Sequence, residues 1–161
     1  MTGENRPRIH PDLAELLRSF NDHDVKYLIA GAVAVGFHAQ PRYTKDLDVF
    51  IKPDPDNAAA AYRALAAFGA PLDGISEQDL ADRNKFFRFG HPPDAVDLMP
   101  ELRGVDFDTA WERRVVVFLD ESKTLQCTVL SAEDTIASKL ASGRPYDLAD
   151  ADAIRRANKT K

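Results

Sequence analysis

Two carboxylates stand one residue apart in the otherwise apolar segment TKDLDVFI, residues 44–51. Side chains alternate along a β-strand, so Asp46 and Asp48 would lie on one face, about 6–7 Å apart. Like charges at this separation repel each other, and burial increases the cost. A divalent cation between them would remove the repulsion, because hard cations prefer oxygen ligands. The pattern predicts a rigid acidic platform for a metal ion; the alternative is a solvent-facing strand that carries two aspartates for solubility.

A third acid and a strand-to-helix turn could complete such a site. Asp97 lies in the apolar segment AVDLMP, and clustered carboxylates hold magnesium ions against substrate phosphates. In LIAGAVAV, a strand passes directly into a helix at Gly31 and Ala32. The N–H groups of a helix N-terminus bind anions, and small residues let a phosphate approach closely. Taken alone, these two residues would also fit a plain tight turn.

Periodicity and capping signals predict the elements that position these residues. Helices are expected at residues 11–23, 31–40, 57–69, 76–79, 106–114, 131–143 and 146–158, and strands at 25–30, 46–52, 85–90, 95–100, 115–119 and 125–130. Gly69 is the expected stop of the alanine-rich helix, and Ser76 and Ser131 each open a capping box. This order predicts a mixed α/β domain.

Composition and charge narrow the class of protein. The 161 residues, 44% of them hydrophobic, predict a single domain at 1–161, with a core at about 10–130 and C-terminal helices at 131–158. A net charge of −5 argues against an open basic face that binds nucleic acid non-specifically. One cysteine, Cys127, fits a reducing compartment, and no signal or membrane-spanning segment is recognisable. We therefore expect a cytoplasmic protein without a membrane partner.

These motifs together resemble the nucleotidyltransferase superfamily, whose fold is that of the DNA polymerase β palm. The family pattern is a strand, then Gly-Gly or Gly-Ser opening a helix, then Asp-x-Asp on the next strand, and later a third acid. The matching residues are Gly31-Ala32, Asp46, Asp48 and Asp97. The resemblance implies a mixed palm-type sheet flanked by helices, with the three acids as catalytic and metal-binding residues. Ala32 departs from the pattern, which removes a possible side-chain hydroxyl from the phosphate site.

Residues 30–51 look especially like the minimal bacterial branch of the superfamily. That branch includes abortive-infection-type toxins, antitoxin-associated nucleotidyltransferases and small antibiotic nucleotidyltransferases. Arg42 and Thr44 match its Arg-x-Thr-x-Asp lead-in. The resemblance implies that both residues help to bind the nucleotide or its phosphates.

The tail SKLASGRPYDLADADAI resembles later motifs of the toxin-like branch, through Lys139, Arg144, Asp147 and Asp150. By analogy, Lys139 would contact the triphosphate. Asp147 or Asp150, with Arg144 beside them, would orient the acceptor or act as a base. The alternative is structural: a solvated Lys139 and a helix-capping Asp147.

Three functional hypotheses follow from the residues and the resemblance. The first is transfer of a nucleoside monophosphate from a nucleoside triphosphate to an acceptor, with Mg²⁺ (or Mn²⁺) as cofactor and release of pyrophosphate. The acceptor would be RNA such as tRNA, a protein or a small molecule, and a cognate toxin or antitoxin protein is a possible partner. The second is a catalytically degenerate fold that binds a nucleotide or a partner protein. The third is an antibiotic-modifying enzyme, because an acidic protein suits a cationic acceptor.

The segment NKFFRFG carries further candidates. Phe86 or Phe89 could stack on a base, and Arg88 could bind a phosphate. Strand aromatics usually belong to the core, so we expect the phenylalanines to be packed there.

Overall fold

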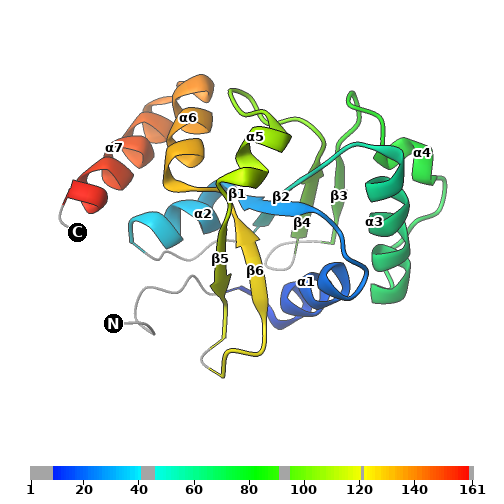
Figure 1. Cartoon of the computed structure of the whole chain (residues 1–161). Coiled ribbons are helices and arrows are strands. Elements are labelled where there is room, and N and C mark those ends of the chain that lie inside the picture. The colour runs from blue at the N-terminus through cyan, green and yellow to red at the C-terminus, as the bar shows by residue number, and fades with distance from the viewer. Residues whose placement is uncertain (1–8, 41–45, 91–94, 121, 160–161) are drawn as a thin grey trace.

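A six-stranded sheet with helices against it forms the protein, as the computed structural model shows for residues 9–40, 46–90, 95–120 and 122–159 (Figure 1). The helices are α1 (Pro11–Asp22), α2 (Gly31–His38), α3 (Pro55–Phe68), α4 (Glu77–Leu80), α5 (Phe107–Glu112), α6 (Ala132–Ser142) and α7 (Pro145–Lys159). The strands are β1 (Tyr27–Ala30), β2 (Asp46–Ile51), β3 (Phe87–Phe89), β4 (Ala95–Met99), β5 (Val115–Phe118) and β6 (Gln126–Val129). The predicted mixed α/β class is confirmed. No helix within these ranges is long and apolar enough to cross a membrane.

The sheet is mixed, with the strand order β3-β4-β2-β1-β6-β5. The pairs β2–β4 and β1–β6 are parallel, and the other neighbouring pairs are antiparallel. Because β1 and β6 run in the same direction, the helices that follow them, α2 and α6, begin at the same end of the sheet. Helices α6 and α7 pack against each other and against α2 (Figure 1). Asp46 and Asp48 lie at this end too, since β2 runs antiparallel to β1 and begins there.

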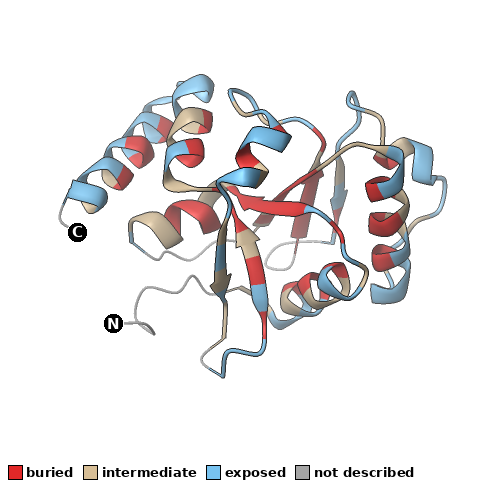
Figure 2. Ribbon diagram, in the orientation of Figure 1, coloured by how far each residue is buried: buried red, intermediate tan, exposed pale blue. Residues whose placement is uncertain are grey.

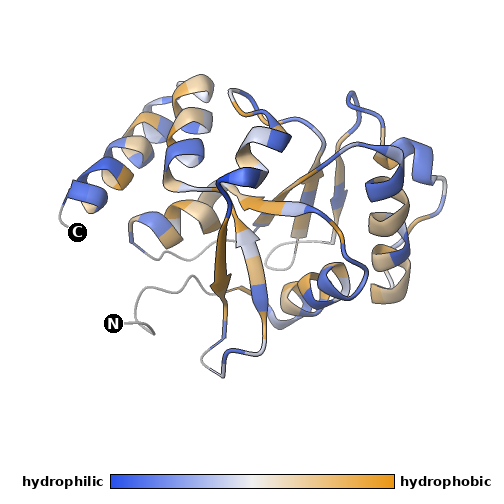
Figure 3. Cartoon of the chain, in the orientation of Figure 1, coloured by the Kyte–Doolittle hydropathy of each residue, from blue (hydrophilic) through white to orange (hydrophobic). Residues whose placement is uncertain are grey.

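Alternation along β2 divides the sheet into two faces. Leu47, Val49 and Ile51 are fully buried in the main core, which α1 and α3 complete. The buried faces of α1 and α3 turn toward the sheet (Figure 2), and the exposed face of α1 is mainly polar (Figure 3). On the opposite face, Phe50 packs edge-on against Phe107 of α5, with 5.0 Å between ring centroids. The second core is therefore small, and it leaves the beginning of β2 uncovered by α5.

The helix ends follow the capping signals in the sequence. Asp54 caps α3 by accepting a hydrogen bond from the Asn57 N–H at 2.6 Å, and Gly69 ends it with a left-handed φ of 96°. Ser76 and Asp79 form the predicted reciprocal capping box of α4. Ser131 caps α6, which fixes where the helix that carries Lys139 begins.

Two details of the prediction are wrong. The first strand begins at Tyr27 and not at residue 25, because the Lys26 N–H and C=O groups are bonded to the Asn57 side chain. Phe86 is 64% exposed, whereas Phe89 is in the core as expected. Phe86 precedes the three residues of β3, so strand alternation does not hold it against the sheet.

Replacing Asn57 by Ala is expected to lower the free energy of unfolding by about 2 kcal/mol. The Asn57 side chain is buried and accepts a hydrogen bond from the Lys26 N–H at 2.7 Å. It also donates to the carbonyls of Lys26 and Lys52, at 3.0 and 2.9 Å. Urea unfolding measures the change, and Asn84→Ala, on an exposed turn, is the control. Equal stability of the two variants would contradict the role of Asn57.

Candidate active site

One row of residues crosses four neighbouring strands and brings the predicted acids together. In the register of the sheet, Ala30 of β1 lies opposite Asp48 of β2, Asp48 lies opposite Asp97 of β4, and Asp97 lies opposite Arg88 of β3. Asp46 is two residues before Asp48 on the same strand face. We call Asp46, Asp48 and Asp97 the acid cluster.

Burial and like charges disfavour the charged form of Asp48 in the acid cluster. The pKa of its carboxyl is raised from 3.8 to about 6, first by burial and then by the negative charges of Asp97 and Asp46. A side-chain hydrogen bond between Asp48 and Asp97 acts in the same direction, so these two carboxyl groups are in close contact. The Lys139 ammonium opposes the rise. The charged form of Asp48 is therefore disfavoured by its surroundings, and a cation bound beside it would stabilise it.

Gly31 lies directly against Asp48 at the start of α2. Its φ is +61°, and a Cβ built on it would lie 2.1 Å from Oδ2 of Asp48. Ala30 is the N-cap of helix α2 and provides no side-chain hydrogen bond to its first N–H groups. The first N–H groups of a helix have no partner within it, so the N-terminus of α2 offers donors beside the acid cluster. Ala32 occupies the next position and is half-buried.

Gly31→Ala is expected to disrupt the site and to lower the free energy of unfolding by about 3 kcal/mol. The methyl group would meet the carboxylate of Asp48 at a distance that no structure tolerates, so Asp48 must move. Gly74→Ala is the matched control, because Gly74 also has a positive φ, +78°, but nothing within 4 Å of the added methyl. Urea unfolding compares the two. If both variants lose the same amount, backbone strain alone explains the effect and the contact with Asp48 is irrelevant.

Lys139 is buried among carboxylates instead of being solvated. Its side chain is only 13% exposed, and Nζ lies 3.4 Å from Oδ1 of Asp147 and 3.2 Å from Oδ2 of Asp150. The electrostatic effect on Asp48 shows that the same ammonium is near the acid cluster. Because α6 begins at the same end of the sheet as α2, the tail residues and the strand acids meet around Lys139.

Asp147 and Arg144 form a local unit at the start of α7. The Arg144 N–H donates to Oδ2 of Asp147 at 3.3 Å, and the Arg144 guanidinium donates to the same oxygen at 2.7 Å. Asp147 has no exposed side-chain surface, and the bond from Arg144 lowers the pKa of its carboxyl. Arg144 is exposed and stacks on Tyr146. Asp147 thus caps the helix and holds Lys139.

Arg88 was weighed from sequence only as a phosphate ligand, but it is bound to the acid cluster. Its Nε and Nη2 donate to Oδ1 and Oδ2 of Asp97 at 2.9 and 3.0 Å. The same Nη2 donates to Oδ2 of Asp46 at 3.1 Å. The sequence did contain a signal for the orientation of Arg88. Because Phe87, Arg88 and Phe89 alternate in a short strand, Arg88 points away from the core.

The donor set fits a hard divalent cation. Three carboxylates converge from two parallel strands, and the pKa of one of them, Asp48, is raised chiefly by burial and then by its negative neighbours. Within the described ranges, no three His, Cys, Asp or Glu side chains already have the mutual geometry of a metal site. The Arg88 guanidinium instead occupies oxygens of Asp97 and Asp46. Arg42 and Thr44 lie outside the described residues, so their predicted roles stay predictions.

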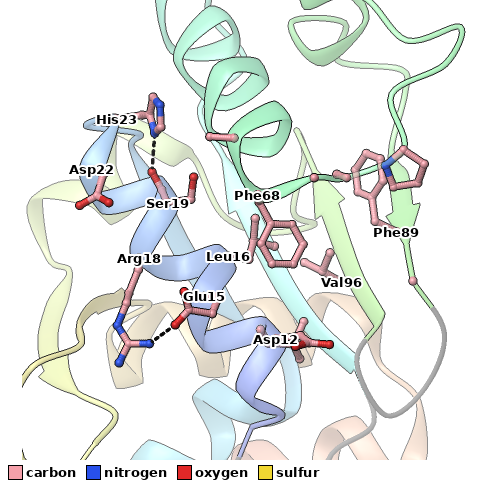
Figure 4. Close-up of a pocket in the computed structure, with 16 residues that line it drawn as sticks. Asp12, Glu15, Leu16, Arg18, Ser19, Asp22, His23, Phe68, Phe89 and Val96 are labelled. Atoms are coloured by element: carbon pink, nitrogen blue, oxygen red, sulfur yellow. Dashed lines mark hydrogen bonds and ion pairs between the residues drawn. The ribbon is translucent and has the colours of Figure 1, made fainter.

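A separate groove of about 780 Å³ lies on the other face of the sheet (Figure 4). It is lined by α1, by the end of α3 around Phe68, and by Phe89 and Val96. Both of these strand residues point to the face opposite Asp97, because they alternate with Arg88 and Asp97 along their strands. The groove is therefore distinct from the acid cluster.

A mixed sheet that presents three carboxylates beside the N-terminus of a helix is the arrangement that the resemblance to nucleotidyltransferases implies. The family model described as "Nucleotidyltransferase of unknown function (DUF6036)" matches residues 8–158, and the chain belongs to this family. The match covers the acid cluster, the turn at Gly31 and the tail around Lys139. No curated protein matches the chain.

Proposed function

We propose that the protein transfers a nucleoside monophosphate from a nucleoside triphosphate to an acceptor and releases pyrophosphate. The observation that carries the proposal is the row in which Asp48 lies between Asp97 and the turn at Gly31. In the reaction, an acceptor oxygen forms a bond to the α-phosphorus, and the bond from that phosphorus to the bridging oxygen breaks. The proton of the acceptor passes to a carboxylate of the site or to water, and pyrophosphate leaves with the bridging oxygen.

Each residue of the site has a role that its position supports. Asp46, Asp48 and Asp97 would hold Mg²⁺ or Mn²⁺, which supplies charge stabilisation for the attacking and leaving oxygens at the α-phosphate. The N–H groups at the start of α2, at Gly31 and Ala32, would receive a phosphate, because they carry partial positive charge.

The tail residues complete the phosphate side of the site. Lys139 would contact the triphosphate, since its ammonium is already close enough to influence Asp48. Asp147 and Asp150 fix its position. Asp150 keeps slightly exposed surface, so it is our candidate for orienting the acceptor, whereas Asp147 is committed to capping.

The test uses one triphosphate with two alternative labels. The protein is incubated with Mg²⁺ and either α-³²P- or γ-³²P-labelled triphosphate, with tRNA, protein and aminoglycoside acceptors in separate reactions. Nucleotidyl transfer puts the α label on the acceptor and leaves the γ label in pyrophosphate. Transfer of the γ label would instead identify a phosphotransferase. The acceptor that becomes labelled distinguishes a toxin-type activity on RNA or protein from an antibiotic-modifying one.

The second candidate is a degenerate nucleotidyltransferase that binds a nucleotide or a partner protein without chemistry. Two observations favour it: Ala32 has no side-chain hydroxyl for a phosphate, and Arg88 is already paired with two acids of the cluster. Mg²⁺-dependent binding of triphosphate, with no label transferred to any acceptor, would support it over the first.

A further inference from the structure

Arg88 binds two of the three acids with a geometry suited to a specific ion pair. Its guanidinium contacts both oxygens of Asp97, at 2.9 and 3.0 Å, and one oxygen of Asp46, at 3.1 Å. A planar guanidinium that bonds both oxygens of one carboxylate is the strongest form of such a pair. A single side chain therefore holds Asp46 and Asp97 toward each other across β2 and β4.

The same two carboxylates are ones that a divalent cation would use under the proposed function. A guanidinium and a divalent cation repel each other at the few ångströms that would separate them on shared ligands. In the described part of the chain, no three potential ligand side chains have metal-binding geometry while Arg88 holds this position. Arg88 and a divalent cation should therefore compete for the acid cluster.

Of the three residues in these ion pairs, Arg88 is the one whose side chain can move away from the others. Its side chain is 46% exposed, whereas those of Asp97 and Asp46 are 12% and 35% exposed. Arg88 stands on β3, which is an edge strand of the sheet, so rotation of its long side chain into solvent requires no change in the backbone. The acids, in contrast, stand on the inner strands β4 and β2 and remain in place.

We propose that Arg88 is an exchangeable counter-ion of the acid cluster, which must leave Asp46 and Asp97 before a divalent cation binds them. This inference rests on the proposed function only in taking the cluster as the ion site. In the metal-free protein, Arg88 offsets the repulsion among the acids and keeps them converged. Loading of the ion then releases a guanidinium at the edge of the site.

Mn²⁺ affinity tests the competition directly. Free Mn²⁺ is counted by electron paramagnetic resonance during titration of the metal-free full chain and of Arg88→Ala and Arg88→Lys variants. Arg88→Ala should bind Mn²⁺ on the order of tenfold more tightly than the unmodified chain, because the competing cation is gone. Arg88→Lys keeps the charge without the planar fork, so it should fall between them.

Arg83→Ala is the matched control for the loss of one positive charge. Arg83 is an exposed arginine paired with Glu101 at 2.7 Å, and it takes no part in the ion pairs described above for the acid cluster. Its removal should change Mn²⁺ affinity much less than removal of Arg88. Circular dichroism checks that each variant is folded. If Arg88→Ala is not folded, Arg88→Lys still tests the competition.

A second measurement follows Arg88 itself in the unmodified chain. An arginine-specific dicarbonyl reagent, read out by peptide mass spectrometry, should modify Arg88 faster with Mn²⁺ than without it, and Arg83 at an unchanged rate. Mn²⁺ binding that is equal or weaker in Arg88→Ala overturns the inference, as does the absence of binding in both proteins. If competition is seen but no label is transferred to any acceptor, the proposed function fails and the exchange of counter-ions stands.

Discussion

Asp48→Asn is expected to slow nucleotidyl transfer by about 1000-fold or more. Asparagine preserves the shape of the side chain but removes the negative charge at the centre of the row between Asp97 and Gly31. An amide is a poor ligand for Mg²⁺ compared with a carboxylate, so the acid cluster would lose its charge and its central donor together. The Mg²⁺-dependent part of triphosphate binding should disappear in the same variant.

The measurement is the rate of label transfer from α-³²P-triphosphate, together with Mg²⁺-dependent binding of a fluorescent triphosphate. Asp73→Asn removes the same charge from an exposed turn and serves as control. Both variants must show native circular dichroism. Undiminished transfer by Asp48→Asn would remove the acid cluster from the mechanism, whatever the acceptor is.

The same substitution is expected to stabilise the metal-free protein above pH 6. The pKa of Asp48 is about 6 in the folded protein and 3.8 for the ordinary carboxyl, chiefly because of burial. Between these values the folded chain binds more protons than the unfolded chain, so the free energy of unfolding falls as pH rises. The penalty is absent below pH 3.8 and complete above about 6. Its size is between about 1 and 3 kcal/mol.

Urea unfolding in EDTA at pH 4 and pH 7.5 measures this effect as a difference between two proteins. Asp48→Asn should gain stability relative to the unmodified chain at pH 7.5, and the gain should shrink toward pH 4. Addition of Mg²⁺ should raise the stability of the unmodified chain and leave Asp48→Asn unchanged, because only the former binds the ion well. A variant less stable at both pH values would contradict the strained charge at Asp48.

Slower transfer and higher stability in Asp48→Asn would together show that the charge of Asp48 destabilises the fold and is needed for ion binding. A variant that merely unfolds loses both activity and stability. Loss of transfer combined with a gain in stability is the signature expected when a repelling charge is removed from a folded protein. The pair of measurements therefore separates a functional role of Asp48 from a structural one.

Much of the fold could be read from local sequence signals. The alternation in residues 46–51 predicted correctly that Asp46 and Asp48 share a face and that Leu47 and Val49 are buried. The caps at Asp54, Ser76 and Ser131 each depend on contacts within four residues, so the sequence contains them almost completely. Where prediction failed, a distant residue decided the outcome, as Asn57 did for the beginning of the first strand.

The candidate site was predictable only in its parts. Sequence could nominate Asp97 and Lys139, but the alternative of a solvated Lys139 was rejected only by the ion pairs with Asp147 and Asp150. Arg88 was assigned to phosphate because its position relative to Asp97 was unknown. The pairing of β3 with β4 is set by packing of both strands on a common core, and a shift by one residue would turn Arg88 to the other face.

By itself, the sequence determined which residues can carry charge on one face of a strand, where the helices start and stop, and that the whole resembles a nucleotidyltransferase. The tertiary structure decided which of those charges meet. Strand register and helix packing join residues 40 or more positions apart, such as Arg88 with Asp46. Such pairings depend on burying apolar surface shared by the whole sheet, and no local segment of the chain contains that information.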